Sequence, residues 1–287
     1  MYARLRGTTL FFDVEGAGLV PDGPRMRERP AALVVHGGPG SDHSGFKPTF
    51  SALADAMQLV YLDQRGQGRS ARDGDPERYT LDENVEDLEA LRRHLGLGPV
   101  AVIGTSYGGM VAMAHAARHP GSVSRLVLVA TAAHAGFIAR ARELLAERGT
   151  PEQRATVARC WDQGFASEED IRQYHLVTGP LYARRFDRAA AEIAHARVPY
   201  APEPLNRAFG PDGFLRRFDL RPELPRITAP TLILAGRHDW ICAPEFSEEI
   251  NALIPGSRLE IFERSGHSLR SDEPDRLIAT IRRFLAG

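Results

Sequence analysis

Gly104-Thr105-Ser106-Tyr107-Gly108 is the stretch that decides the fold of this 287-residue chain. Its Gly-x-Ser-x-Gly pattern follows the apolar run 100–103, typical of a buried strand, and precedes the small, Ala-rich run 109–117, typical of a helix. A strand, a sharp turn and a helix in this order lift the serine hydroxyl clear of a sheet, as in a nucleophile elbow. The sequence therefore predicts Ser106 as a nucleophile. The alternative is a glycine-rich turn with an inert serine.

A serine nucleophile needs a general base and an acid that orients the base, and two later stretches offer both. Asp239 follows the apolar run 231–236, and His267 follows the alternating run 258–263. Like Ser106, both side chains come just after a predicted strand, and such strand ends line one crevice in an open parallel sheet. The order Ser106, Asp239, His267 predicts a catalytic triad, with His267 as the base and Asp239 holding its imidazole. Considered alone, Asp239 would be interpreted as a turn or helix N-cap carboxylate, and His267 would be interpreted as a surface-loop histidine.

A glycine-rich stretch near the start of the chain is the candidate for an oxyanion hole. His36-Gly37-Gly38-Pro39-Gly40 follows the apolar run 31–35. Glycines let the backbone turn its N–H groups inward, and a proline stiffens the loop. We expect the backbone N–H groups of Gly38 and Tyr107 to stabilise negative charge on the reacting carbonyl oxygen. A plain Gly/Pro turn is the alternative.

Strand and helix patterns alternate along most of the chain, which predicts the α/β class. This alternation favours a mostly parallel sheet covered by helices on both faces. Residues 8–15 and the segment before them are expected to form an N-terminal hairpin. Residues 16–30 are expected to form a loop. The predicted strands lie near 31–35, 58–62, 99–103, 125–130, 231–235 and 258–263, and the predicted helices near 46–56, 83–95, 107–119, 244–253 and 273–285.

Residues 134–222 break the alternation. This segment shows no convincing strand pattern and is rich in Arg and Glu, with several prolines. We interpret it as a helical cap inserted into one α/β core, whose first part is 1–133 and whose second part is 223–287.

Five motifs at workable spacing resemble the proline iminopeptidase family of α/β-hydrolases: 36–40, 63–70, 104–109, 236–239 and 266–267. The similarity extends over roughly 5–130 and 222–285, and the H-G-G-P-G and D-Q-R-G-x-G-x-S motifs are its most specific part. The resemblance implies an α/β-hydrolase fold with a helical cap, a serine hydrolase activity, and no metal or other cofactor. The segment 63–70 is expected to brace the loops beneath the site.

The chain departs from the family where the substrate's amino group is held. Family aminopeptidases bind a free α-amino group with acidic side chains, in the cap and, in some members, directly after the triad Asp. Here Trp240 and Ile241 follow Asp239, which suggests an apolar wall beside the substrate. Gly213 stands where a family segment carries Glu, and Asp212 is the acid that could substitute for it.

These observations predict a serine hydrolase that cleaves a small amide or ester bond through an acyl-enzyme. The first hypothesis is a proline-iminopeptidase-like amidohydrolase acting on a small amide or a peptide N-terminus. The alternative is a carboxylesterase or acyltransferase with an apolar acyl pocket. A non-catalytic binding protein of the same fold is a third hypothesis, which the intact order of the triad disfavours.

Composition restricts the partners and the setting. The formal net charge is −1, so we expect a small-molecule or short-peptide substrate and no nucleic-acid or membrane partner. No apolar run reaches about 18 residues, and the start of the chain lacks the apolar region of a signal peptide. Cys160 and Cys242 lack metal-ligand spacing, and a reducing, cytoplasmic setting is expected. A disulfide between them and the oligomeric state stay open.

Overall fold

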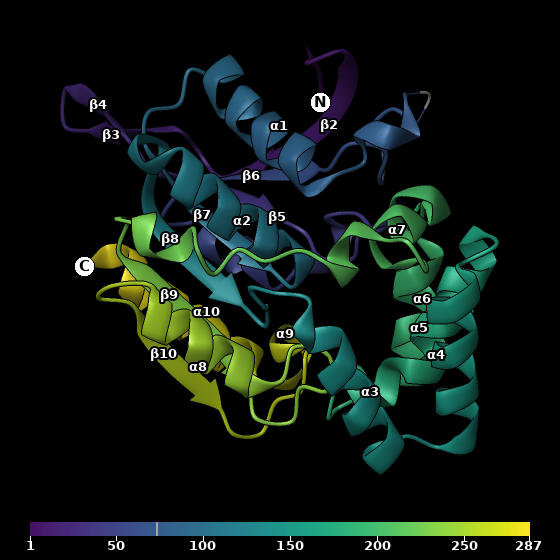
Figure 1. Cartoon of the computed structure of the whole chain (residues 1–287). Coiled ribbons are helices and arrows are strands. Elements are labelled where there is room, and N and C mark those ends of the chain that lie inside the picture. Colours follow the sequence, from purple (N-terminus) through teal and green to yellow (C-terminus); the bar gives the residue numbers. More distant parts are fainter. Residues whose placement is uncertain (73) are drawn as a thin grey trace.

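An eight-stranded sheet forms the centre of the molecule (Figure 1). The structure is a computed structural model and describes residues 1–72 and 74–287. The strand order is β1-β2-β6-β5-β7-β8-β9-β10, with antiparallel pairing at the β1-β2-β6 edge and parallel pairing elsewhere. The predicted mostly parallel sheet is confirmed. Its strands are β1 (Tyr2–Leu5), β2 (Thr8–Glu15), β5 (Ala31–Val35), β6 (Gln58–Asp63), β7 (Val100–Thr105), β8 (Val123–Val129), β9 (Thr231–Gly236) and β10 (Arg258–Phe262).

Helices cover both faces of the sheet, as the α/β class requires. Side chains alternate across a strand, so in β5 Leu33 and Val35 join one buried cluster while Ala32 and Val34 join the other. The first cluster is shared with α1 (Leu81–His94), α2 (Tyr107–Arg118) and α8 (Pro244–Leu253), and the second with α9 (Leu269–Asp272) and α10 (Pro274–Ala286). A sheet buried on both faces explains why its central strands are near-continuous apolar runs.

Five further helices lie between β8 and β9 in the chain and gather on one side of the sheet in Figure 1. The arrowheads of β8 and β10 point toward that side, so these helices lie over the carboxyl ends of the strands. Residues 134–222, all of them described, add no strand to the main sheet. The five helices are α3 (Gly136–Arg148), α4 (Pro151–Gln163), α5 (Glu168–Tyr182), α6 (Arg188–Ala196) and α7 (Pro202–Phe209).

Local sequence starts three of these helices at defined residues. Thr150 and Gln153 form a reciprocal capping box at α4, with Pro151 at the first helical position. The side chains of Ser167 and Asp187 accept backbone N–H groups at the starts of α5 and α6. Such caps satisfy N–H groups that have no partner inside the helix.

The structure corrects two predicted elements. In place of the continuous helix predicted for 46–56, the chain forms two short 3-10 helices, η1 (Ser44–Phe46) and η2 (Phe50–Leu53). Pro48 separates them, because a proline lacks the N–H that a helix needs and Lys47 before it is extended. The predicted loop 16–30 contains the hairpin β3 (Leu19–Asp22) and β4 (Arg25–Glu28). Both strands are largely exposed, so they lack the apolar alternation that marks a strand in sequence.

The structure also describes the state of the two cysteines and the length of the apolar helices. Cys160 and Cys242 are both buried, free thiols, and burial raises the pKa of Cys160 to about 11. No helix in the described part of the chain is long and apolar enough to cross a membrane.

Candidate active site

Ser106 sits at a strained turn between β7 and α2. Its φ of 55° and ψ of −122° lie outside the helical and strand regions, where a non-glycine residue is costly and typical of functional sites. The glycines on either side are required by close backbone approach: a Cβ on Gly104 would lie 2.3 Å from the carbonyl oxygen of Gly108, and one on Gly108 would lie 2.1 Å from that of Val35. The elbow predicted for this stretch therefore has a steric origin.

Asp239 and His267 form a buried pair at the ends of β9 and β10. His267 Nδ1 lies 2.7 Å from Asp239 Oδ2. The other oxygen of Asp239 accepts the backbone N–H groups of Ile241, at 2.8 Å, and Cys242, at 2.9 Å. Because a carboxylate only accepts hydrogen bonds, Nδ1 carries the proton and Nε2 is left as the proton acceptor. This tautomer is the one that a general base needs.

Backbone packing holds the loops of this pair together. A Cβ on Gly236 would lie 2.0 Å from the carbonyl oxygen of Gly266, and His238 donates its N–H to the carbonyl of Ser265 at 3.0 Å. Thr105, the residue before Ser106, lines one small cavity together with His267. Among the described residues no hydrogen bond joins Ser106 Oγ to His267. Such bonds are often long without substrate and tighten in the complex.

The stretch 36–40 lies against the serine. A Cβ on Gly37 would lie 3.0 Å from the Ser106 Cβ, and Gly38 adopts a φ of +112°, which favours glycine. The N–H groups of Gly38 and Tyr107, the two predicted oxyanion donors, donate to no acceptor in the described part of the chain. Gly40 fixes the stretch, since its N–H donates to Gln67 Oε1 at 2.7 Å.

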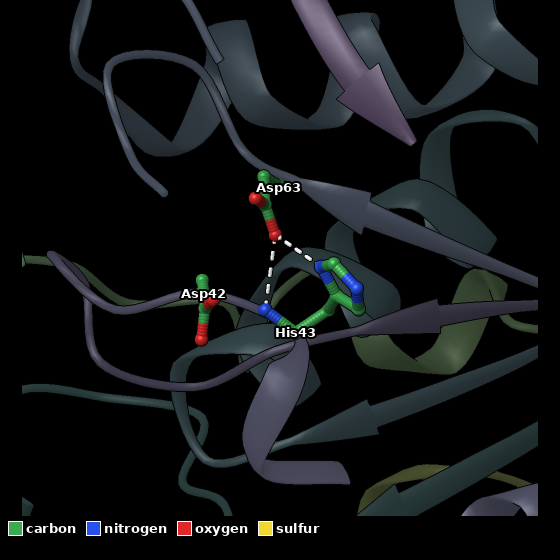
Figure 2. A group of neighbouring side chains, drawn as sticks. All are labelled: Asp42, His43 and Asp63. Atoms are coloured by element: carbon green, nitrogen blue, oxygen red, sulfur yellow. Dashed lines mark hydrogen bonds and ion pairs between the residues drawn. The ribbon is translucent and has the colours of Figure 1, made fainter. Parts of the chain in front are cut away.

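The loop that follows 36–40 is braced by a buried cluster of Asp42, His43 and Asp63 (Figure 2). His43 donates its backbone N–H, at 3.0 Å, and its ring Nδ1, at 2.6 Å, to Asp63 Oδ1. The N–H of Arg69 donates to the other Asp63 oxygen at 2.9 Å, and its guanidinium pairs with Asp42. Burial alone would raise the pKa of Asp63, but the hydrogen bond and charge of His43 hold it below its usual value.

The ligand atoms of this cluster lie within 4.8 Å of one another, a spacing that could hold a cation. Arg69 and the backbone already supply positive charge and donors to both carboxylates, so the cluster fits a loop brace better than a metal centre. The bracing role expected for 63–70 is confirmed by these contacts and by the bond from Gly40 to Gln67.

The structure places the three predicted substrate-binding residues in different settings. Trp240 is buried, stacked on Trp161 of α4 at 5.9 Å between ring centroids, and its indole N–H has no acceptor among the described residues. Ile241 is buried as well. Asp212 is exposed in the turn after α7 and makes no ion pair with any described residue. Their contacts with substrate stay predictions.

Sequence reasoning missed a group of ring and basic side chains beside His267. His175 of α5 stacks on His195 of α6 at 5.3 Å and on Tyr200 at 5.5 Å between ring centroids. Arg270 lines the same small cavity as His267. Its position, three residues after the predicted base, was the one sequence signal that could have pointed to it.

A strained serine on a strand-to-helix turn and an Asp–His pair, both just after the carboxyl ends of strands in a mostly parallel sheet, are typical of the α/β-hydrolase class of enzymes. The chain belongs to the α/β-hydrolase fold family, whose model matches residues 30–274, and within it to the proline iminopeptidase-like group. It is 31% identical over 282 residues to proline iminopeptidase PfmaB of Pestalotiopsis fici, covering 96% of this chain and 98% of that protein.

Solved structures agree on the fold. The proline iminopeptidase of Mycobacterium smegmatis superposes with a TM-score of 0.79 at 23% identity, covering 100% of this chain and 97% of that one. A thermophilic esterase from Thermogutta terrifontis superposes with a TM-score of 0.73 at 26% identity, covering 99% and 96%. The family and these relatives make the protein a hydrolase, and their names include both peptidases and esterases.

Proposed function

We propose that the protein is a serine hydrolase that cleaves a small amide or ester bond through an acyl-enzyme. The observation that carries this proposal is the 2.7 Å pair of His267 and Asp239, with its acceptor nitrogen left for a serine proton, on the same strand-end side as the strained Ser106. The proposed substrate is a small molecule or a short peptide.

The geometry supports a two-step reaction. Ser106 Oγ attacks the carbonyl carbon while its proton passes to His267 Nε2, and the carbonyl oxygen takes the negative charge. The N–H groups of Gly38 and Tyr107 stabilise that oxygen. The proton on His267 then passes to the leaving amine or alcohol as its bond to the acyl carbon breaks. Water attacks the acyl-enzyme, gives its proton to His267, and releases the acid and Ser106.

Proline-iminopeptidase-like cleavage of a small amide or peptide N-terminus is the first candidate, supported by the relatives. An ammonium group needs a paired charge when it is desolvated. Asp212 is the acid proposed for this role, although it is exposed. If it serves, Asp212→Asn raises the KM for proline arylamide relative to the KM for an N-blocked ester. An equal change for both substrates, or none, removes Asp212 from the site.

A carboxylesterase or acyltransferase is the second candidate. The feature that favours it is the apolar pair Trp240 and Ile241 at the position where some family members carry an acid. Comparing proline and alanine arylamides with short-chain aryl esters under the same conditions separates the two candidates. Turnover of esters alone selects the second.

The serine mechanism itself is tested with a fluorophosphonate probe. We expect the probe to label the wild-type protein and to fail with Ser106→Ala, which also loses hydrolysis. Ser257→Ala is a matched control, since the Ser257 hydroxyl bonds, among the described residues, only to Asn251 near the end of α8. Labelling or hydrolysis that persists in Ser106→Ala rejects the proposal.

A further inference from the structure

Arg270 is a cation without a counter-charge. Its guanidinium makes no hydrogen bond or ion pair with any residue that the structure describes. The guanidinium carbon lies 5.4 Å from the ring centroid of Phe46, and Nη2 would lie 3.5 Å from a Cβ on Gly45. Arg276, on the next helix, also covers an aromatic ring, but it pairs with Glu273. Arg270 is half-buried, and a partly desolvated cation without an ion-pair partner is unfavourable, so its position favours an anion.

The surroundings of Arg270 contain ring donors in place of acids. Burial lowers the pKa of Arg270, and the neighbouring Tyr200 opposes that effect. Burial, followed by the neighbouring His195 and Arg270, lowers the pKa of His175 to about 3. Burial, followed by Arg270 and Arg172, lowers the pKa of His195 to about 4. Both rings are therefore neutral at neutral pH. His195 Nδ1 lies 2.5 Å from the hydroxyl oxygen of Tyr200, and the near acid Asp42 is paired with Arg69.

These side chains lie between the cap and the candidate catalytic residues. Arg270 shares a cavity with His267, and Tyr182 packs edge-on against both His175 and His267. Ala201 donates its N–H to the carbonyl of Gly40 at 2.9 Å, which places Tyr200 beside the stretch 36–40. Arg270 and Tyr200 therefore lie next to loops that carry the candidate catalytic residues.

We propose that Arg270, together with the Tyr200–His195 pair and the ring of His175, binds a carboxylate group of the substrate. Because Tyr200 and His195 share one hydrogen bond, either the Tyr200 O–H or the His195 Nε2–H is left to donate to that carboxylate. A guanidinium matches a carboxylate with two parallel N–H donors. The preferred substrates are then esters or amides whose acyl part carries a free carboxylate, and a substrate ammonium is disfavoured at this position. The inference rests on the proposed serine hydrolase function and names its substrate class.

The test compares 4-nitrophenyl hydrogen glutarate with its methyl ester, in which a neutral methyl ester replaces the free carboxylate. We expect wild-type kcat/KM to favour the anionic ester. In Arg270→Met the ratio of anionic to neutral kcat/KM falls by about 10- to 100-fold, mostly through KM, the usual effect of losing a charged hydrogen bond. Arg270→Lys keeps the positive charge but not the two parallel N–H donors. It should therefore retain part of the wild-type preference for the anionic ester. Arg276→Met is the matched control and leaves the ratio unchanged.

A binding measurement separates this inference from the reaction. Glutarate is expected to raise the Tm of Ser106→Ala, glutaramide is not, and the rise is lost in Ser106→Ala/Arg270→Met. A wild-type preference for the methyl ester, or the same ratio in wild type and Arg270→Met, overturns the carboxylate subsite while Ser106 labelling still stands. If Arg270→Met does not fold, Arg270→Lys decides, and an undiminished ratio there overturns the inference. Hydrolysis that survives Ser106→Ala instead rejects the proposed function.

Discussion

Tyr182, the last residue of α5, packs its ring edge-on against His267, with 5.4 Å between ring centroids and 80° between ring planes. The Tyr182 carbonyl also accepts the N–H of Ser268 at 2.9 Å. The same ring meets Trp240 edge-on at 5.4 Å. Helix α5 therefore contacts the loop of the proposed base directly, so that the packing of α5 and the orientation of the base are linked.

This contact predicts that Tyr182 is a positioning residue for His267. Tyr182→Ala removes the ring that restrains the imidazole and should lower kcat by about 10-fold or more, since small misplacements of catalytic groups are costly. Tyr182→Phe keeps the ring and loses only the contact with the Tyr174 hydroxyl, so it should restore most of kcat. Steady-state kinetics on one aryl ester checks both variants. Equal loss in the two would assign the effect to the hydroxyl and contradict ring packing.

Asp239→Asn tests the imidazole tautomer. The Asn oxygen can still accept the N–H groups of Ile241 and Cys242, so the loop should keep its structure. Its amide nitrogen would then face His267 as a donor and push the ring toward the wrong tautomer. We expect kcat to fall by at least about 10³-fold with little change in Tm. A variant with near wild-type kcat would show that Asp239 does not orient the base.

Gly108→Ala tests the steric basis of the elbow. The new Cβ would meet the backbone carbonyls of Val35 and His36 at 2.1 Å and 2.6 Å, so strand and helix must separate. We expect the free energy of unfolding to fall by about 2 kcal/mol or more. Gly121→Ala is the control, because a Cβ there meets nothing within 4 Å. Denaturant unfolding of the two variants measures the difference, and equal stabilities would refute the close approach.

The stacked histidines predict a loss of stability in acid. The pKa of His175, about 3, and that of His195, about 4, lie below the ordinary value of 6.5, chiefly because of burial. The next cause is His195 for His175 and Arg270 for His195. The unfolded chain therefore binds more protons than the folded one between about pH 6.5 and pH 4. The stability present above pH 6.5 should fall as pH decreases through this window.

Thermal unfolding between pH 7 and pH 4 checks this expectation. The variant His175→Phe keeps a stacked ring beside His195 and Tyr200 without a titrating group, so its Tm should decrease less with acid than that of the wild type. His94→Gln, at an exposed position, should follow the wild type. A wild-type slope retained in His175→Phe would assign the acid sensitivity to other groups.

Local sequence accounts for the elements that carry the candidate site. Gly104 and Gly108 mark the elbow because any Cβ there collides with backbone, and a steric requirement of this kind is visible in the residue types themselves. The order of Ser106, Asp239 and His267 after three apolar runs predicted the Asp–His pair that the structure shows at 2.7 Å. The same reasoning failed over 46–56, where Pro48 divides the apolar residues into two 3-10 turns.

The sequence by itself determined the sheet, the elbow and the order of the proposed triad, because each follows from short-range sterics, apolar periodicity and motif spacing. Only the tertiary structure decided what surrounds the serine. Trp240 became a buried partner of Trp161 in α4, Asp212 came to lie at the surface, and Arg270 came to lie over the ring of Phe46, without an ion pair to any described residue. The first two of these relations depend on how residues 134–222 fold over the strand ends, and contacts between segments distant in the chain leave no periodic trace in the sequence.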